Sequence, residues 1–112
     1  MAAIAKLAAK ADVTNNDLKM LEMVLNEDPS ANVRLMVVNA LQPMFAKNTV
    51  QQLFINTLSK QDDPLIQSTI VDILVEARSK QAVPQMLALL DDKNTSPSTQ
   101  TKIKTGIESF LN

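Results

Sequence analysis

Pairs of adjacent acidic residues are the feature of this sequence whose residue types and spacing could support chemistry. The pairs are Glu27-Asp28, Asp62-Asp63 and Asp91-Asp92. Two neighbouring carboxyl groups could serve as general acid and base, or could bind calcium. Each pair, however, lies where one predicted helix ends and the next begins, and an aspartate at a helix start accepts hydrogen bonds from free backbone N–H groups. We therefore interpret the pairs as helix caps or solvated loops, with catalysis or calcium binding as the alternative.

The rest of the composition offers little to catalysis. The chain has no His, Cys, Tyr or Trp, which removes the usual general bases near neutral pH and the common nitrogen and sulfur ligands of metals. Its single glycine, Gly106, is too few for a glycine-rich phosphate loop. Gly106 falls inside a predicted helix, where we interpret it as a close contact between helices rather than a hinge. We expect no enzymatic activity, no metal and no cofactor.

Length and charge place the chain among ordinary globular proteins. It has 112 residues, 46% of them hydrophobic and 21% charged, with a formal net charge of −1. The acidic and basic residues are scattered, so we expect no nucleic-acid partner. No apolar run reaches the roughly 18 residues of a membrane span. Lys6 and Lys10 interrupt the apolar start, which is atypical of a secretory signal, and the compartment stays open.

Apolar residues at spacings of three and four predict an all-α chain of about seven helices. Their approximate ranges are 2–11, 14–27, 32–43, 49–58, 64–77, 79–90 and 97–110. The start and stop signals are a capping box at Thr14 and Asp17, Pro43 ending or kinking the third helix, a cap at Asn48 or Thr49, an Asp63-Pro64 start, a start at Ser79 and a Ser96-Pro97 start.

The predicted helices recur with a period of 33 residues. Among the odd-numbered helices the matching apolar columns are Ile4, Val37, Ile70, Ile103; Leu7, Ala40, Ile73, Gly106; Ala8, Leu41, Leu74, Ile107; and Ala11, Met44, Ala77, Phe110. Among the even-numbered helices they are Met20, Leu53, Met86; Leu21, Phe54, Leu87; and Val24, Thr57, Leu90. A fixed period of this length predicts stacked helix pairs whose columns form a shared core, an α-solenoid.

The period also predicts the organisation of the chain. We expect one repeat domain over residues 1–112, with units at about 1–27, 28–62 and 63–93 and a capping helix at 94–112. The unpaired last helix has a polar outer surface, as a capping element needs. Extending the period backwards places the start of the first repeat before residue 1. We therefore expect the chain to be the C-terminal piece of a longer protein.

Several short segments carry a family resemblance. They are Asp28-Pro29, Asn32-Val33-Arg34-Leu35, Asn39-Ala40-Leu41, Asp63-Pro64-Leu65-Ile66-Gln67 and Ala82-Val83-Pro84 with Leu87 and Leu89-Leu90. Together they resemble HEAT repeats of the short bacterial type, which implies a right-handed α-solenoid of HEAT-like helix pairs. The run 32–90 also resembles the HEAT segments of bacterial anti-sigma-factor proteins, where such segments follow a membrane span. That likeness implies a possible membrane tether in the full-length protein.

The sequence departs from a regular family pattern at the positions that would pair neighbouring units. Asn39 stands where the next unit has Asp72, and Gln67 and Gln100 stand where an earlier unit has Arg34. An Asp/Arg ladder between units is therefore incomplete. Arg34 itself lies in the first turn of its helix, where the helix dipole does not favour a cation. We expect a carboxylate of an adjacent loop to hold it.

The second helix of each pair is the predicted site of partner binding, because second helices line the concave side of the HEAT-like stacks that the chain resembles. The residues between the buried columns are Lys19, Glu22, Met23, Gln52, Ile55, Asn56, Gln85, Ala88 and Leu89. Neutral amides beside scattered apolar side chains suit a protein or peptide more than phosphate or lipid. The alternative is that Met23, Ile55 and Leu89 complete the core.

Two other functions stay open. Self-association, as a homodimer, could use the N-terminal edge, where the Ala-rich first helix has no preceding repeat. Least favoured is an accessory role in a lyase or glycosylase of the HEAT type, because Lys19 alone does not make the basic concave face that DNA would need.

Overall fold

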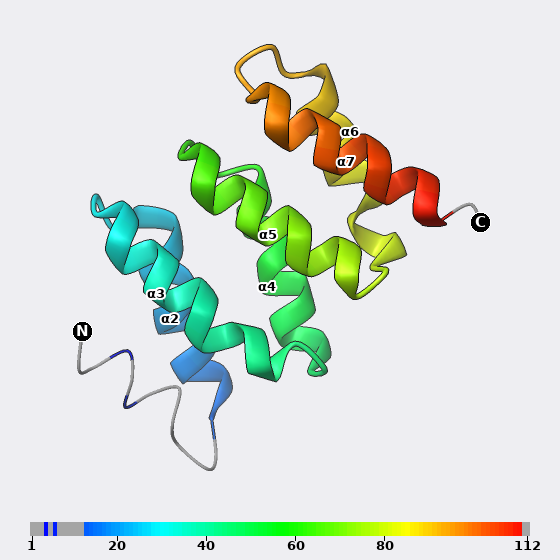
Figure 1. Cartoon of the computed structure of the whole chain (residues 1–112). Helices are drawn as coiled ribbons and strands as arrows, with labels where there is room; N and C mark the ends of the chain where they lie inside the picture. The colour runs from blue at the N-terminus through cyan, green and yellow to red at the C-terminus, as the bar shows by residue number, and fades with distance from the viewer. Residues whose placement is uncertain (1–3, 5, 7–12, 111–112) are drawn as a thin grey trace. The chain divides into compact units, whose positions relative to one another are not determined.

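The computed structural model describes residues 4, 6 and 13–110, and these residues are all-helical (Figure 1). The helices are α2 (Asn15–Glu27), α3 (Ala31–Leu41), α4 (Asn48–Leu58), α5 (Pro64–Glu76), α6 (Val83–Asp91) and α7 (Pro97–Phe110), with short 3-10 helices η1 (Gln42–Met44) and η2 (Lys80–Ala82). No strand occurs in this part of the chain. The all-α class is confirmed, and the succession of helices is compatible with a helical solenoid. Of the predicted first helix, only Ile4 and Lys6 lie among the described residues.

The chain divides into two compact units, with the boundary after Leu53, inside α4. In the first unit α2 packs against α3. Besides the capping residue Asp17, the side chains that these two helices bury are Leu18, Leu21, Leu25, Val37, Val38 and Leu41. All six are aliphatic, as the sequence predicts for the core of this protein.

Local signals fix both ends of these first helices. Thr14 Oγ1 accepts a hydrogen bond from Asp17 N at 3.1 Å, and Asp17 Oδ2 accepts one from Thr14 N at 3.0 Å. This is the predicted capping box, which satisfies two N–H groups at the start of α2. Helix α3 ends at Leu41, and the following residues, including Pro43, form η1. The predicted effect of Pro43 is thus confirmed.

In the second unit α7 packs against both α5 and α6. Asp63 caps α5, because its Oδ1 accepts hydrogen bonds from Leu65 N at 2.9 Å and Ile66 N at 3.2 Å. Pro64 occupies the first helical position, where its missing N–H costs nothing. At the start of α7, Ser96 Oγ accepts from Thr99 N at 3.3 Å. Both predicted starts that combine a cap with a proline are confirmed.

Helix α5 ends in a turn at Arg78 that two backbone hydrogen bonds close. Arg78 N donates to Val75 O at 2.9 Å and Ser79 N donates to Leu74 O at 3.0 Å, the pattern of a Schellman motif. Arg78 adopts the left-handed conformation that this motif requires, with φ of 53°. Glycine usually takes that position, but the Arg78 guanidinium also donates to Ser109 O at 3.0 Å. The arginine thereby holds the last turn of α7 beside the end of α5.

Two predicted helix starts were wrong by a few residues. Helix α4 begins at Asn48 itself, so Asn48 and Thr49 lie in its first turn instead of preceding it. Ser79 makes no side-chain cap and precedes η2, while the α-helix begins only at Val83. The reason for the second error is Pro84, which fits the first turn of an α-helix but not its interior.

The even-numbered columns were wrong at two positions. Met20 is 54% exposed and Leu87 is 47% exposed, although Met86 and Leu21, which share those columns, are fully buried. On their own helices, Met20 and Leu87 are rotated by more than about 100° from the centre of the buried stripe. The period identifies which helix positions correspond, but each helix has its own rotation about its axis.

A buried polar group fixes the loop between α4 and α5. Gln61 is 3% exposed, and its Nε2 donates to Thr57 Oγ1 at 2.9 Å. Gln67 Nε2 donates to Gln61 O at 2.7 Å. Thr57, the polar member of an otherwise apolar column, therefore supplies one of the hydrogen bonds that satisfy the buried Gln61 amide.

Candidate partner-binding surface

The predicted surface begins on α2, where its three members differ in exposure. Lys19 is exposed and Glu22 is half-buried. Met23 is 56% exposed, so it does not complete the core. Met20, which the column pattern had placed in the core, adds a second exposed methionine to this helix. Flexible, polarisable methionines at a surface are typical of protein-binding sites.

On α4 the three predicted members of the surface differ in exposure. Ile55 is buried at 3% exposure, Gln52 is half-buried and Asn56 is exposed. Ile55 is therefore a core residue, as the alternative interpretation held. Asn56 is the position on this helix that a partner can reach most readily.

On α6 the pattern is similar. Leu89 is buried at 5% exposure, so it too belongs to the core, whereas Ala88 is exposed. Gln85 is half-buried, and its Oε1 atom is buried with no hydrogen-bond partner. The acceptor oxygen of the Gln85 amide is thus not accessible to a protein that binds on this surface. Over the three helices, the fully exposed members of the predicted set are Lys19, Met23, Asn56 and Ala88.

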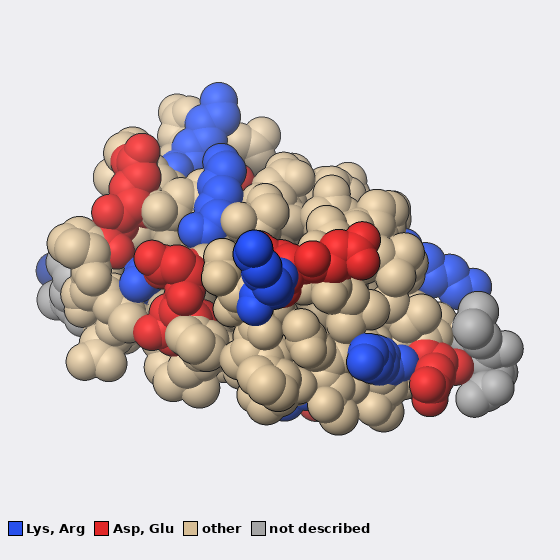
Figure 2. Space-filling view, turned by 90° about the horizontal axis from the view of Figure 1, so that it is seen from above, with Lys and Arg blue, Asp and Glu red and all other residues tan. Residues whose placement is uncertain are grey.

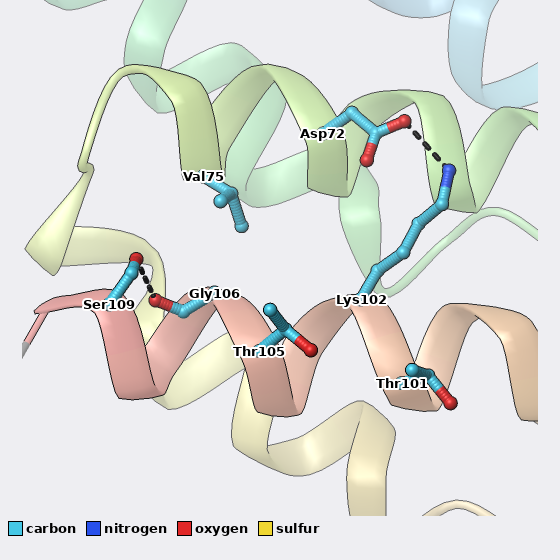
Figure 3. A pocket seen from close by; sticks show the side chains of 7 residues that line it. All are labelled: Asp72, Val75, Thr101, Lys102, Thr105, Gly106 and Ser109. Atoms are coloured by element: carbon cyan, nitrogen blue, oxygen red, sulfur yellow. Dashed lines mark hydrogen bonds and ion pairs between the residues drawn. The ribbon is translucent and has the colours of Figure 1, made fainter.

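A groove between α5 and α7 is a feature that the sequence did not predict (Figure 3). It has a volume of about 320 Å³. Its lining residues are Asp72, Val75, Thr101, Lys102, Thr105, Gly106 and Ser109. Lys102 crosses from α7 to α5, and its Nζ lies 2.7 Å from Asp72 Oδ2. This ion pair is exposed, so it contributes little stability by itself.

The groove narrows where Val75 meets Gly106. Val75 points from α5 towards Gly106 on α7 (Figure 3). A Cβ added at Gly106 would overlap Val75 Cγ2 and lie 3.1 Å from Cγ1. The prediction that Gly106 marks a close helix contact is confirmed. The hydroxyls of Thr101 and Ser109, which line the groove, donate to carbonyl oxygens of their own helix.

The carboxylate pairs serve as turn and cap residues. One member of each pair accepts a backbone N–H: Asp28 from Ser30 at 2.8 Å, Asp63 from Leu65 at 2.9 Å and Asp92 from Asn94 at 2.9 Å. The capping interpretation is confirmed. Among the described residues, no group of three or more acidic side chains is arranged to hold a metal ion.

The face of the molecule drawn in Figure 2 carries charges of both signs. On the face drawn in Figure 2, basic and acidic side chains are interspersed among uncharged ones. No described helix is long and apolar enough to cross a membrane.

Some predictions concern features that the structure leaves untested. Self-association through the first helix concerns residues 2–11, which lie outside the described part except for Ile4 and Lys6. Arg34 is half-buried in the first turn of α3, and its pairing with a loop carboxylate stays a prediction. The boundaries of the repeat units also stay predictions.

Comparison with known proteins identifies one family. The model of the HEAT-repeat family matches residues 18–101. No curated protein and no solved structure matches the chain. The family match begins inside α2, includes α3, α4, α5 and α6 in full, and ends in the first turns of α7.

Proposed function

The chain belongs to the HEAT-repeat family, whose repeats generally act as non-catalytic scaffolds for protein–protein interaction, and on that premise we propose that it binds a protein or peptide on its second helices, α2, α4 and α6. The observation that carries the proposal is that each second helix exposes at least one member of the predicted set, which are Lys19 and Met23 on α2, Asn56 on α4 and Ala88 on α6. On α2 the exposed apolar Met23 lies one turn from the exposed, charged Lys19, and such a mixture is typical of a protein-binding surface.

Burial narrows the predicted binding set. Ile55 and Leu89 act from within the core, where they position the exposed residues next to them in the sequence, Asn56 and Ala88. Gln52 and Gln85 are half-buried and contribute the edge of the surface. A glutamate at position 85 is a poor probe of binding, because it would place a carboxylate oxygen where the Gln85 Oε1 atom is buried.

Photo-crosslinking from exposed positions tests the proposal. A photoreactive residue at Asn56 or Ala88 should form a discrete covalent adduct with a protein partner in extracts of the source cell. Asn39 is the matched control, since it is an exposed asparagine on α3, a first helix. If Asn39 gives the same adducts as Asn56, the second helices are not the binding site.

A finer assignment rests on resemblance. We infer that the chain is of the short bacterial type and that its relatives include the HEAT segments of bacterial anti-sigma-factor proteins, because the run 32–90 resembles them. The full-length gene tests this inference. An upstream span followed by residues of this period would support it, and a gene lacking a membrane span would contradict it.

A further inference from the structure

The solvent-facing side of α2 has an apolar residue at its centre. Met23 is 56% exposed and lies nearly opposite the buried Leu21 and Leu25 on the helix. Surface helices normally place polar side chains at that position. Met20, 54% exposed, lies one turn before Met23 and widens the apolar area. Two large apolar side chains thus lie outside the core on neighbouring turns of α2.

The charges on the same side of α2 are symmetric about Met23. Lys19 lies four residues before it and Glu27 four residues after it, and both are exposed. A step of four residues rotates a helix position by only about 40°, so the three side chains share one side of the helix. Within the part of the chain that is described, neither Lys19 nor Glu27 forms a salt bridge. The two charges are opposite in sign and equally distant from Met23.

We propose that this surface, the α2 stripe of Lys19, Met20, Met23 and Glu27, binds a second copy of the chain in an antiparallel, two-fold pairing. A two-fold interface brings the same surface of both subunits together. Met23 then packs on Met23 of the other copy, and each Lys19 faces a Glu27. Helices in contact lie about 8–10 Å apart, a distance that long lysine and glutamate side chains span.

Charge selects the antiparallel orientation and a second copy as the occupant. In a parallel pairing Lys19 would face Lys19 and Glu27 would face Glu27, and both like-charge pairs would repel. In the antiparallel pairing both pairs attract. The last turn of α2 contains no basic residue, so the incoming Lys19 also meets the negative end of the helix dipole.

The area of the α2 stripe makes this a weak association. Helix α2 has 13 residues, which corresponds to a length of roughly 20 Å. One side of such a helix buries on the order of half of the ~800 Å² per partner typical of a stable complex. We expect a dissociation constant between about 10 µM and 1 mM. The pairing goes beyond the proposed function: it assigns the α2 part of the proposed surface to a second copy and leaves the exposed residues of α4 and α6 available to another protein.

Sedimentation of charge variants tests the pairing. At low salt, the protein should pass from monomer to dimer between about 10 µM and 1 mM. Lys19→Glu and Glu27→Lys should each weaken the dimer roughly 10-fold, because each turns two attractive pairs into two repulsive ones. An equimolar mixture of the two variants should recover a dimer at least as tight as that of the unmodified chain. The control is Leu65→Gln, at an exposed leucine of α5, and it should leave dimerisation unchanged.

Two results would overturn the proposal. One is a monomer at every concentration up to about 1 mM. The other is a dimer that neither charge variant weakens, which would place self-association elsewhere, such as the N-terminal edge. The equimolar mixture is also a control for misfolding, since two misfolded variants would not form a dimer with each other. Failure of the pairing leaves the crosslinking result at Asn56 and Ala88 unaffected, so the two proposals fail separately.

Discussion

Replacing Gly106 with alanine tests the close approach of α5 and α7. In an ordinary helix interior this change stabilises the protein by up to about 1 kcal/mol, because alanine has the higher helix propensity. Here the new Cβ would overlap Val75 Cγ2. Valine in a helix keeps essentially one χ1 rotamer, so the side chain cannot turn aside without cost. Overpacking of this kind costs typically 1–3 kcal/mol. We therefore expect Gly106→Ala to destabilise the protein by about 1 kcal/mol.

The sign of the effect should reverse when Val75 is shortened. In a Val75→Ala background the overlapping methyl groups are gone, so Gly106→Ala should stabilise the protein by up to about 1 kcal/mol. The double-mutant cycle then yields a coupling of about 2 kcal/mol, large for a pair without charge or hydrogen bond. Urea denaturation of the four proteins measures it. Thermal melts should show shifts of about 4 °C for each kcal/mol.

A particular outcome would refute the reasoning. If Gly106→Ala stabilises the unmodified protein, the helices have room to separate and the glycine does not set their distance. Additive effects in the cycle would lead to the same conclusion. Lys104→Ala, at an exposed position of α7, controls for changes in helix propensity and should shift stability by less than about 0.5 kcal/mol.

Two further predictions concern polar groups. Asp63→Ala should lower the free energy of unfolding by about 1 kcal/mol because α5 loses its cap. Asp63→Asn should retain most of that stabilisation, because an asparagine side chain can accept the same hydrogen bonds. If urea denaturation shows equal losses for both variants, the negative charge, and not the hydrogen bonds, stabilises the helix start. Gln85→Met should raise the free energy of unfolding by about 1 kcal/mol, since it removes the buried Oε1 that has no partner and keeps the side-chain length; an unchanged or lower urea midpoint would contradict this.

The sequence predicted the helices well because their determinants are local. The capping box at Thr14 and the Asp63-Pro64 start act through atoms within three residues of each other, so spacing alone reveals them. Gly106 was predictable for a related reason, since a lone glycine in a helix needs a packing explanation. Its partner Val75 was not, because the contact joins residues 31 positions apart that do not share a column.

The 33-residue period shows which helix positions are equivalent, but it does not show which of their side chains are exposed. A repeat of 33 residues shows that Met20 and Met86 are equivalent, yet one is 54% exposed and the other buried. The rotation of each helix depends on which neighbours it packs against, and that is a tertiary property. For the same reason the predicted binding set combined core residues such as Ile55 with exposed ones such as Asn56.

The positions where the period fails are also the ones that bear on function. A repeat protein maintains its core by repetition, so side chains that follow the period are sufficiently explained by packing. The period places Met20 in the core, yet Met20 is exposed, and Met23 lies near it on the side of α2 opposite the buried Leu21 and Leu25. Packing within the chain does not explain either side chain. Side chains whose exposure disagrees with the sequence pattern are expected at functional surfaces. Here Met20 and Met23 lie between Lys19 and Glu27, and in the proposed antiparallel pairing these two charges would face Glu27 and Lys19 of a second copy.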